Sequence, residues 1–355
     1  MKEKLMPVFR SPQNPIIEPK DVKPSREDFE VIGVFNAGVT RFEGLVVLLL
    51  RVAERPIGTH PEMVLTGVYD VTQRNIILKE FSKSDPENDF SDPRLIVGPS
   101  ETYLTSISHL RLARSADGVN FDIEDRPAFG PANEIESFGI EDPRITLIDG
   151  KYYITYVAVC PYGVTTCLAS TKDFKSFERR GIIFCPENKD VVLFPELIGG
   201  KYYALHRPDS PLFSRQDIWL AESPDLFCWG NHRFLCAPAA EGWDSIKVGA
   251  GAVPFKTKYG WLEIYHGVDR DNRYCLGAML LEADRPWKVI ARVDNPIFEP
   301  QADYETNGFV GNVVFTCGLL YEQDKLKIYY GAADTTVCYV ELPLKDVFES
   351  LNSSD

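Results

Sequence analysis

Residues 113–121 read ARSADGVNF, and the same pattern returns as ASTKDFKSF at 169–177 and as AESPDLFCW at 221–229. Each copy has Ala first, Ser or Thr two residues later, Asp two residues after that and an aromatic residue at its end. The copies begin 56 and 52 residues apart, and a degenerate fourth copy, AMLLEADRPW, begins 57 residues further on at Ala278. Self-similarity at this period indicates a repeat architecture such as a solenoid or a propeller.

Runs rich in aromatic and β-branched residues accompany the repeat, and this composition is typical of β-strands. The runs are GLVVLLLR at 44–51, KYYITYV at 151–157, KYYALHR at 201–207, GWLEIYH at 260–266 and KLKIYYG at 325–331. Gly, Pro, Asn and Asp separate the runs, as they do at turns. About five units of four short strands match the spacing of propeller blades. The sequence therefore predicts an all-β fold, a five-bladed β-propeller.

The whole chain, residues 1–355, is expected to form this single domain. Residues 1–30, rich in proline and charge, are predicted to wrap the outside of the propeller. Residues 340–355 are predicted to form a short C-terminal tail, in which LKDVFESL has helical periodicity over one or two turns.

Composition and charge exclude several classes of protein. With 44% hydrophobic and 25% charged residues the chain has the composition of an ordinary globular protein. Its formal net charge of −14 disfavours nucleic acid as a partner. Its longest apolar stretch, 45–50, is too short to span a membrane, and the first residues lack the apolar segment of a signal peptide, so we expect a cytoplasmic protein. The eight cysteines stand singly, which predicts reduced thiols and no metal site.

Three of the strand runs carry a cationic or ionisable side chain seven residues after the turn that opens the run. These side chains are Arg51, Arg207 and His266. Equal register on a strand means equal facing. If these runs are the innermost strands of their blades, the three side chains converge at the mouth of the axial channel and can hold an anion. The alternative is that each belongs to a separate surface ion pair.

The segment SFGIEDPR at 137–144 places two acidic residues, Glu141 and Asp142, directly before Pro143. The residue before a proline is held extended, which fixes the direction of its side chain. Asp142 is therefore a candidate for an aimed catalytic carboxyl group. By itself, however, an Asp-Pro pair is also common in turns that have no catalytic role.

The chain resembles glycoside hydrolase family 130 along nearly its whole length. The motifs that carry the resemblance are FNAGV at 35–39, LLLRVAERP at 48–56, GIEDPR at 139–144, NKDVVLFPE at 188–196, LHRP at 205–208, IYHGV at 264–268, RYCLGA at 273–278, NVVFTCG at 312–318 and YYGAADT at 329–335. The resemblance implies a five-bladed propeller, in agreement with the repeat. It also implies that Asp142 is the single catalytic acid and that phosphate is bound by Lys189, Arg207, His266 and Tyr274. Asn36, Arg51 and Asp334 match positions that hold the sugar and line the phosphate side of the donor site. We also expect His109 to contact the substrate.

The reaction that the resemblance implies is inverting phosphorolysis of a β-mannoside, which yields α-mannose 1-phosphate and a shortened sugar. Inorganic phosphate is then a co-substrate, and no cofactor or metal is expected. Phosphate is itself the nucleophile, so cations replace the second carboxylate that an inverting hydrolase needs. The resemblance implies that the proton of Asp142 travels through the 3-hydroxyl of the bound mannose. We expect burial to raise the pKa of Asp142.

The stretch YLTSISHLRLARSADG at 103–118 is most similar to enzymes that act on β-1,2-mannobiose or β-1,2-oligomannan, while β-1,4-linked substrates stay open. The alternatives are a hydrolase of the same family and a non-catalytic carbohydrate-binding propeller. The sequence does not fix the oligomeric state, and homo-oligomers are common among such enzymes.

Overall fold

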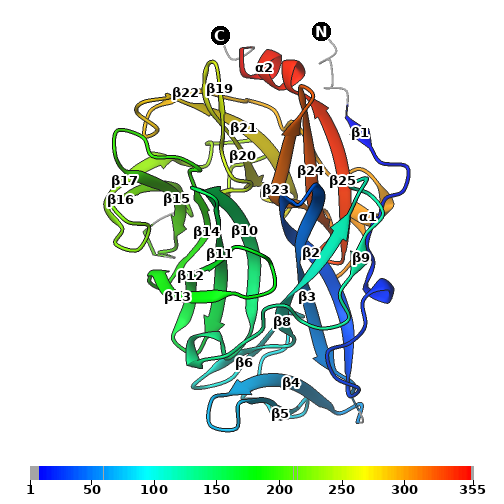
Figure 1. Cartoon of the computed structure of the whole chain (residues 1–355). Helices are drawn as coiled ribbons and strands as arrows, with labels where there is room; N and C mark the ends of the chain where they lie inside the picture. The colour runs from blue at the N-terminus through cyan, green and yellow to red at the C-terminus, as the bar shows by residue number, and fades with distance from the viewer. Residues whose placement is uncertain (1–7, 59, 211, 214, 353–355) are drawn as a thin grey trace.

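The computed structural model describes residues 8–58, 60–210, 212–213 and 215–352, and these form a five-bladed β-propeller (Figure 1). Each blade is built on four antiparallel strands. The ends of the chain, residues 1–7 and 353–355, lie outside the described residues, so the predicted wrapping segment and tail are described only in part.

The blades follow one another along the chain. The first consists of β2 (Phe29–Phe42), β3 (Leu45–Pro56), β8 (Ile107–Ser115) and β9 (Asp122–Ile123). The second consists of β10 (Ile140–Ile148), β11 (Lys151–Cys160), β12 (Gly163–Thr171) and β13 (Glu178–Phe184). The third consists of β14 (Asn188–Leu193), β15 (Tyr202–Pro208), β16 (Ile218–Ser223) and β17 (Gly230–Cys236). The fourth consists of β18 (Lys247–Ala250), β20 (Gly260–Val268), β21 (Tyr274–Leu281) and β22 (Val289–Arg292), with β19 (Phe255–Thr257) added beside β20.

The fifth blade joins the two ends of the chain. It consists of β23 (Val314–Glu322), β24 (Lys325–Ala332), β25 (Thr336–Pro343) and, as its outer strand, the N-terminal β1 (Phe9–Arg10). The short helices η1 (Pro19–Asp21), η2 (Glu134–Glu136) and α1 (Asp303–Thr306) lie between strands. The helix α2 (Leu344–Asn352) follows β25, as its periodicity predicts, and buries Val347 and Leu351.

The Asp-containing repeat forms the turn before the outermost strand of the first three blades. Asp117, Asp173 and Asp225 each accept hydrogen bonds from two backbone N–H groups two and three residues further on, at 2.8–2.9 Å. A short carboxylate that binds the following backbone in this way stabilises a tight turn. The repeat therefore specifies the same turn, the one between the third and fourth strands, in each of these blades.

The five strand runs are the second strands of their blades, not the innermost ones, which corrects our expectation. The first strands β2, β10, β14 and β23 approach one another around the axis. Each blade packs between two others, so both faces of a second strand are buried and its sequence is continuously apolar, as in β3. The apolar run alone does not distinguish a second strand from a first.

Three of the first strands bulge at the same level, where the chain turns a polar side chain toward the axis. The register shifts between Phe35 and Gly38 in β2, between Glu141 and Arg144 in β10, and between Lys189 and Val192 in β14. Within these bulges Asn36, Asp142 and Asp190 adopt positive φ values of 48°, 46° and 55°, so Asp142 is not in the extended conformation that we expected before Pro143. β-Bulges re-aim side chains next to functional sites. The three bulges therefore aim one polar group from each of three consecutive blades at a common point.

An insertion between β3 and β8 lies outside the propeller ring, at the bottom of Figure 1. It contains two small sheets, β4 (Met63–Asp70) with β5 (Asn75–Ser82), and β6 (Leu95–Val97) with β7 (Thr102–Leu104). A separate apolar cluster that includes Ile96, Tyr103 and Phe138 joins it to the propeller.

The described residues contain no helix that is long and apolar enough to cross a membrane. All eight cysteines are free thiols, of which Cys185 and Cys228 are exposed and the other six are buried.

Candidate functional site

A cavity of about 330 Å³ opens at the level of the three bulges and takes lining residues from all five blades and from the insertion. Pockets of this size hold small molecules. Eight of the nine predicted site residues line it: Asn36, Arg51, Asp142, Lys189, Arg207, His266, Tyr274 and Asp334. The three residues of equal register all reach the cavity. Arg51 lies opposite Phe35 and Arg207 opposite Lys189, each at a bulge. His266 lies opposite Gly249 on the regular strand β18, and its Nε2 lies 3.5 Å from Oδ2 of Asp190 in the β14 bulge.

His109 is the predicted residue that the structure does not bring to the cavity. It lies opposite Val52 on β8, one position away from the pair formed by Arg51 and Leu110. A shift of one residue on a strand turns the side chain to the other face of the sheet. His109 is buried beside Arg111, whose Nη2 lies 3.3 Å from its Nε2, and burial lowers the pKa of His109 to about 3. It is a core residue, and our assignment of His109 as a substrate contact is corrected.

The acidic half of the cavity is organised around Arg51. Its Nη1 donates to Oδ1 of Asp142 at 2.9 Å, and its Nη2 donates to Oε1 of Glu141 at 2.6 Å. The amide of Asn36 donates to the same Oδ1 of Asp142, also at 2.9 Å. Two donors from the first blade thus fix the carboxyl group that the second blade supplies.

The pKa of Asp142 is lowered, so our expectation of a raised value is wrong. Burial pushes the pKa upward, but the positive charges of Arg51, Lys189 and Arg144 outweigh burial. The neighbouring Asp334 behaves in the opposite way. Burial, with the charge of Asp142 nearby, raises the pKa of Asp334 to about 6, although Arg51 opposes the shift. Of the two carboxyl groups, Asp334 therefore holds a proton to the higher pH.

The basic half of the cavity is organised around Asp190, which the sequence argument did not select. Its Oδ2 lies 2.8 Å from Nη1 of Arg207 and 3.5 Å from Nε2 of His266, and its Oδ1 accepts from Arg144 at 3.2 Å. Asp190 is 1% exposed, and it stays ionised because Arg207 and the other cations lower its pKa against the effect of burial. A buried carboxylate with several cationic partners positions them rather than reacting.

His266 is a neutral ring, although it stands in the predicted set of cations. Burial lowers the pKa of His266 to about 3 despite the nearby Asp190. Its Nε2 lies 3.3 Å from Nη1 of Arg207 and 3.5 Å from Oδ2 of Asp190. His266 therefore offers a neutral imidazole to the cavity instead of a positive charge.

Lys247 supplies a further amine to the cavity, and the sequence argument missed it. Its Nζ lies 4.8 Å from the centre of the Tyr274 ring. Burial, together with the charges of Arg207 and Lys189, lowers the pKa of Lys247 to about 8, so the group is mostly protonated at neutral pH. Lys247 precedes a stretch of small residues that does not have the composition of the predicted strands. It reaches the site because it is the first residue of β18, where it lies opposite Val268.

Arg144 connects the acidic and basic halves of the cavity through its hydrogen bonds. It is 1% exposed, and its Nε donates to the carbonyl oxygen of Gly251 at 2.8 Å, while its Nη2 donates to Ala250 and Asp190. The arginine of the EDPR motif therefore joins the second, third and fourth blades next to Asp142. Among the described residues, no group of three His, Cys, Asp or Glu side chains is placed to hold a metal ion.

Comparison with known proteins gives concordant matches. Residues 93–353 match the model of glycoside hydrolase family 130, described as beta-1,4-mannooligosaccharide phosphorylase. The chain is 47% identical to a beta-1,2-mannobiose phosphorylase of Listeria innocua over 98% of this chain and 99% of that protein. It is 43% identical to a 1,2-beta-oligomannan phosphorylase of Thermoanaerobacter over 71% of this chain and 84% of that protein. The solved complex of the Listeria innocua enzyme with beta-1,2-mannobiose superimposes with a TM-score of 0.96, over 98% of this chain and 100% of that chain.

Proposed function

Because the chain belongs to glycoside hydrolase family 130, we propose that it is a mannoside phosphorylase that cleaves β-1,2-mannobiose or short β-1,2-mannan chains with inorganic phosphate. The observation that carries this proposal is the division of one cavity into two halves. Asp142 and Asp334 line the acidic half, while Lys189, Arg207 and Lys247 line the basic half.

The basic half suits an anion. Lys189 and Lys247 contribute ammonium groups, and Arg207 contributes a guanidinium group whose direction Asp190 sets. Preorganised cations of this kind bind phosphate and hold it for in-line attack. An inverting hydrolase would need a carboxylate here to activate water. Asp190 is engaged with its arginine partners and is not available for that task.

In the proposed reaction a phosphate oxygen attacks the anomeric carbon of the mannose from the face opposite the leaving oxygen. The bond between C1 and the glycosidic oxygen breaks, and a proton from Asp142 reaches that oxygen through the 3-hydroxyl of the mannose. One inversion converts the β-mannoside into α-mannose 1-phosphate. Asn36 and Arg51 hold the carboxyl group of Asp142 in place for this transfer.

Phosphate binding also prepares the acid. Arg51, Lys189 and Arg144 lower the pKa of Asp142, and a bound phosphate dianion offsets part of their positive charge. The pKa of Asp142 then rises, because burial favours the protonated carboxyl group. Asp334, with a pKa of about 6, lies nearby and can hold the proton until the substrates arrive. The acid therefore becomes competent only with its nucleophile in place.

Incubation with β-1,2-mannobiose, in the presence and absence of inorganic phosphate, tests the proposal. We expect cleavage only with phosphate, and one mannose 1-phosphate for each bond that breaks. Equal release of mannose in both incubations would identify a hydrolase, and no turnover in either would indicate a binding module. A parallel incubation with β-1,4-mannobiose tests the linkage, and faster cleavage of that sugar would overturn the β-1,2 assignment.

A further inference from the structure

One cationic side chain at the cavity comes from outside the propeller. Arg94 lies in the insertion, directly before β6, and lines the cavity together with Leu95, Leu104 and Ser106 of the same insertion. All the other cationic side chains of the cavity come from the blades. Arg94 is therefore the basic group that the insertion contributes.

The geometry around Arg94 fixes its guanidinium group. Its Nε and Nη2 donate to the two carboxylate oxygens of Asp92 at 3.0 and 2.7 Å, an arrangement that holds the planar group in one orientation. The backbone is fixed as well, because Thr105 N donates to the carbonyl oxygen of Arg94 at 2.9 Å. The Nη1 group makes no hydrogen bond to the described part of the chain, so two N–H donors remain for a ligand.

The charge of Arg94 acts on ionisable groups in both halves of the cavity. It contributes to the lowered pKa of Lys247, and it opposes the rise in the pKa values of Tyr274 and Asp334. The positive charges of Arg94 and Lys247 repel each other. The carboxylate of Asp92 offsets that repulsion, so the insertion can hold a cation at the cavity.

We propose that Arg94 is a phosphate-binding residue that the insertion adds to the cavity, with Asp92 as its positioning residue. This inference rests on the proposed function. Its Nη1 donates to an oxygen of phosphate that is not the attacking oxygen, while Lys189, Arg207 and Lys247 bind from the blades. The insertion thereby serves the phosphate side of the reaction, although it lies outside the propeller ring.

The test uses the full chain and four variants: Arg94→Ala, Arg94→Lys, Asp92→Asn and the control Arg55→Ala. Arg55 is matched to Arg94, because it is 51% exposed against 52% and also forms an ion pair with an acidic residue, but it does not line the cavity. The KM for phosphate is measured at saturating β-1,2-mannobiose, and the KM for mannobiose at saturating phosphate. Calorimetry with inorganic phosphate alone measures binding without turnover.

For Arg94→Ala we expect the KM for phosphate to rise about tenfold, the loss that one hydrogen bond to a charged group produces, and the KM for mannobiose to change less than about twofold. Arg94→Lys should recover part of the loss. The KM of Asp92→Asn for phosphate should lie between those of the unmodified protein and Arg94→Ala, and Arg55→Ala should leave both KM values unchanged. A rise in the KM for mannobiose alone, or a response like that of Arg55→Ala, would overturn the inference. Absence of phosphate-dependent cleavage in the unmodified protein would instead refute the proposed function, and the calorimetric comparison would still decide whether Arg94 binds phosphate.

Discussion

At the scale of single residues, the cavity contains carboxyl groups of similar chemistry whose surroundings give them different tasks. Cations keep the pKa of Asp142 low, burial raises that of Asp334 to about 6, and Asp190 stays ionised to hold Arg207. Environments that separate the pKa values of neighbouring acids are a common way to assign them different roles. The sequence motif could identify Asp142, but its surroundings come from three other blades.

Replacement of Asp142 by Asn tests its role as the acid. The amide keeps the size of the side chain and can still accept from Asn36 and Arg51, but it cannot deliver the proton. We expect kcat to fall by about 10²- to 10⁴-fold. The affinity for β-1,2-mannobiose, measured by calorimetry, should change little. A variant that keeps more than a tenth of the activity would contradict the assignment.

Lys247 predicts a pH dependence of phosphate use. Its ammonium charge is present below a pKa of about 8 and is lost as pH rises through that value. The value of kcat/KM for phosphate should therefore decline above pH 8. Lys247→Arg, which keeps its charge, should move the decline to higher pH, while Lys247→Met should lower kcat/KM throughout and flatten this step. The three proteins are compared in the same buffers, and identical profiles would exclude a role for the charge of Lys247.

The candidate site could be predicted from the sequence where a motif contains the residue itself. Asp142, Lys189, Arg207 and Tyr274 lie in such motifs, and all four line the cavity. Asp190 stands inside the same NKD motif as Lys189, but nothing in a linear sequence says that it holds Arg207. His109 does not line the cavity, because the facing of its side chain depends on strand pairing, which the sequence does not fix to one residue.

At the scale of elements, the bulges in β2, β10 and β14 turn ordinary blade strands into a site. They supply Asn36, Asp142 and Asp190 at one level, and the second strands supply Arg51, Arg207 and His266 beside them. The repeat predicts the blades and their Asp turns, because these signals are local. It does not predict the bulges, because an extra residue in one strand is defined only by its partner strand.

The strand β18 must pass close to the basic half, and Gly249 permits this approach. A Cβ atom at this position would lie 2.4 Å from Oδ2 of Asp190 and 2.4 Å from Cε1 of His266. We expect Gly249→Ala to displace both side chains, to raise the KM for phosphate several-fold and to cost about 1–3 kcal/mol in the free energy of unfolding.

The control for this prediction is Gly230→Ala on β17, where a Cβ atom would meet no neighbour within 4 Å. Steady-state kinetics and denaturant unfolding compare the two variants with the unmodified protein. If Gly249→Ala behaves like the control, close packing at β18 is not what positions Asp190 and His266.

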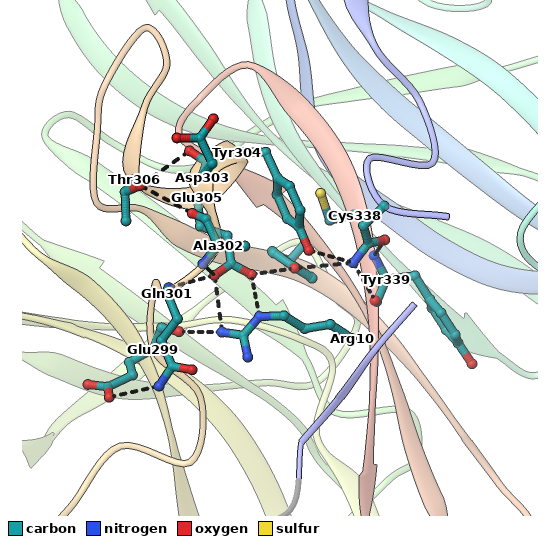
Figure 2. A network of polar contacts seen from close by, with 12 residues as sticks. Arg10, Glu299, Gln301, Ala302, Asp303, Tyr304, Glu305, Thr306, Cys338 and Tyr339 are labelled. Atoms are coloured by element: carbon teal, nitrogen blue, oxygen red, sulfur yellow. Dashed lines mark hydrogen bonds and ion pairs between the residues drawn. The ribbon is translucent and has the colours of Figure 1, made fainter. Parts of the chain in front are cut away.

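At the scale of the whole molecule, the N-terminal strand β1 joins the last blade as its outer strand. Arg10 on β1 donates from Nε and Nη2 to the two carboxylate oxygens of Glu305 at 2.8 and 3.0 Å (Figure 2). Glu305 is fully buried and also accepts from Tyr330 and from the backbone of Gln301 and Ala302. This contact joins positions that are 295 residues apart in the sequence, so no local sequence pattern predicts it.

Removal of Arg10 should therefore open the ring more easily without touching the cavity. Arg10→Ala leaves a buried carboxylate without its charged partner, and we expect a loss of about 2–3 kcal/mol in the free energy of unfolding. Urea unfolding measures the loss, and Arg41→Ala, which removes an exposed ion pair with Glu322, is the control with an expected loss below about 1 kcal/mol. Equal losses in the two variants would show that the N-terminal contact does not secure the ring. The kinetic constants of Arg10→Ala at low temperature should match those of the unmodified protein.

The most direct test of the account is phosphorus and proton NMR of the first product formed from β-1,2-mannobiose in phosphate buffer. The two-sided cavity predicts that each bond cleaved consumes one phosphate and yields mannose 1-phosphate in the α configuration. Free mannose with the phosphate signal unchanged, or a product in the β configuration, would contradict it.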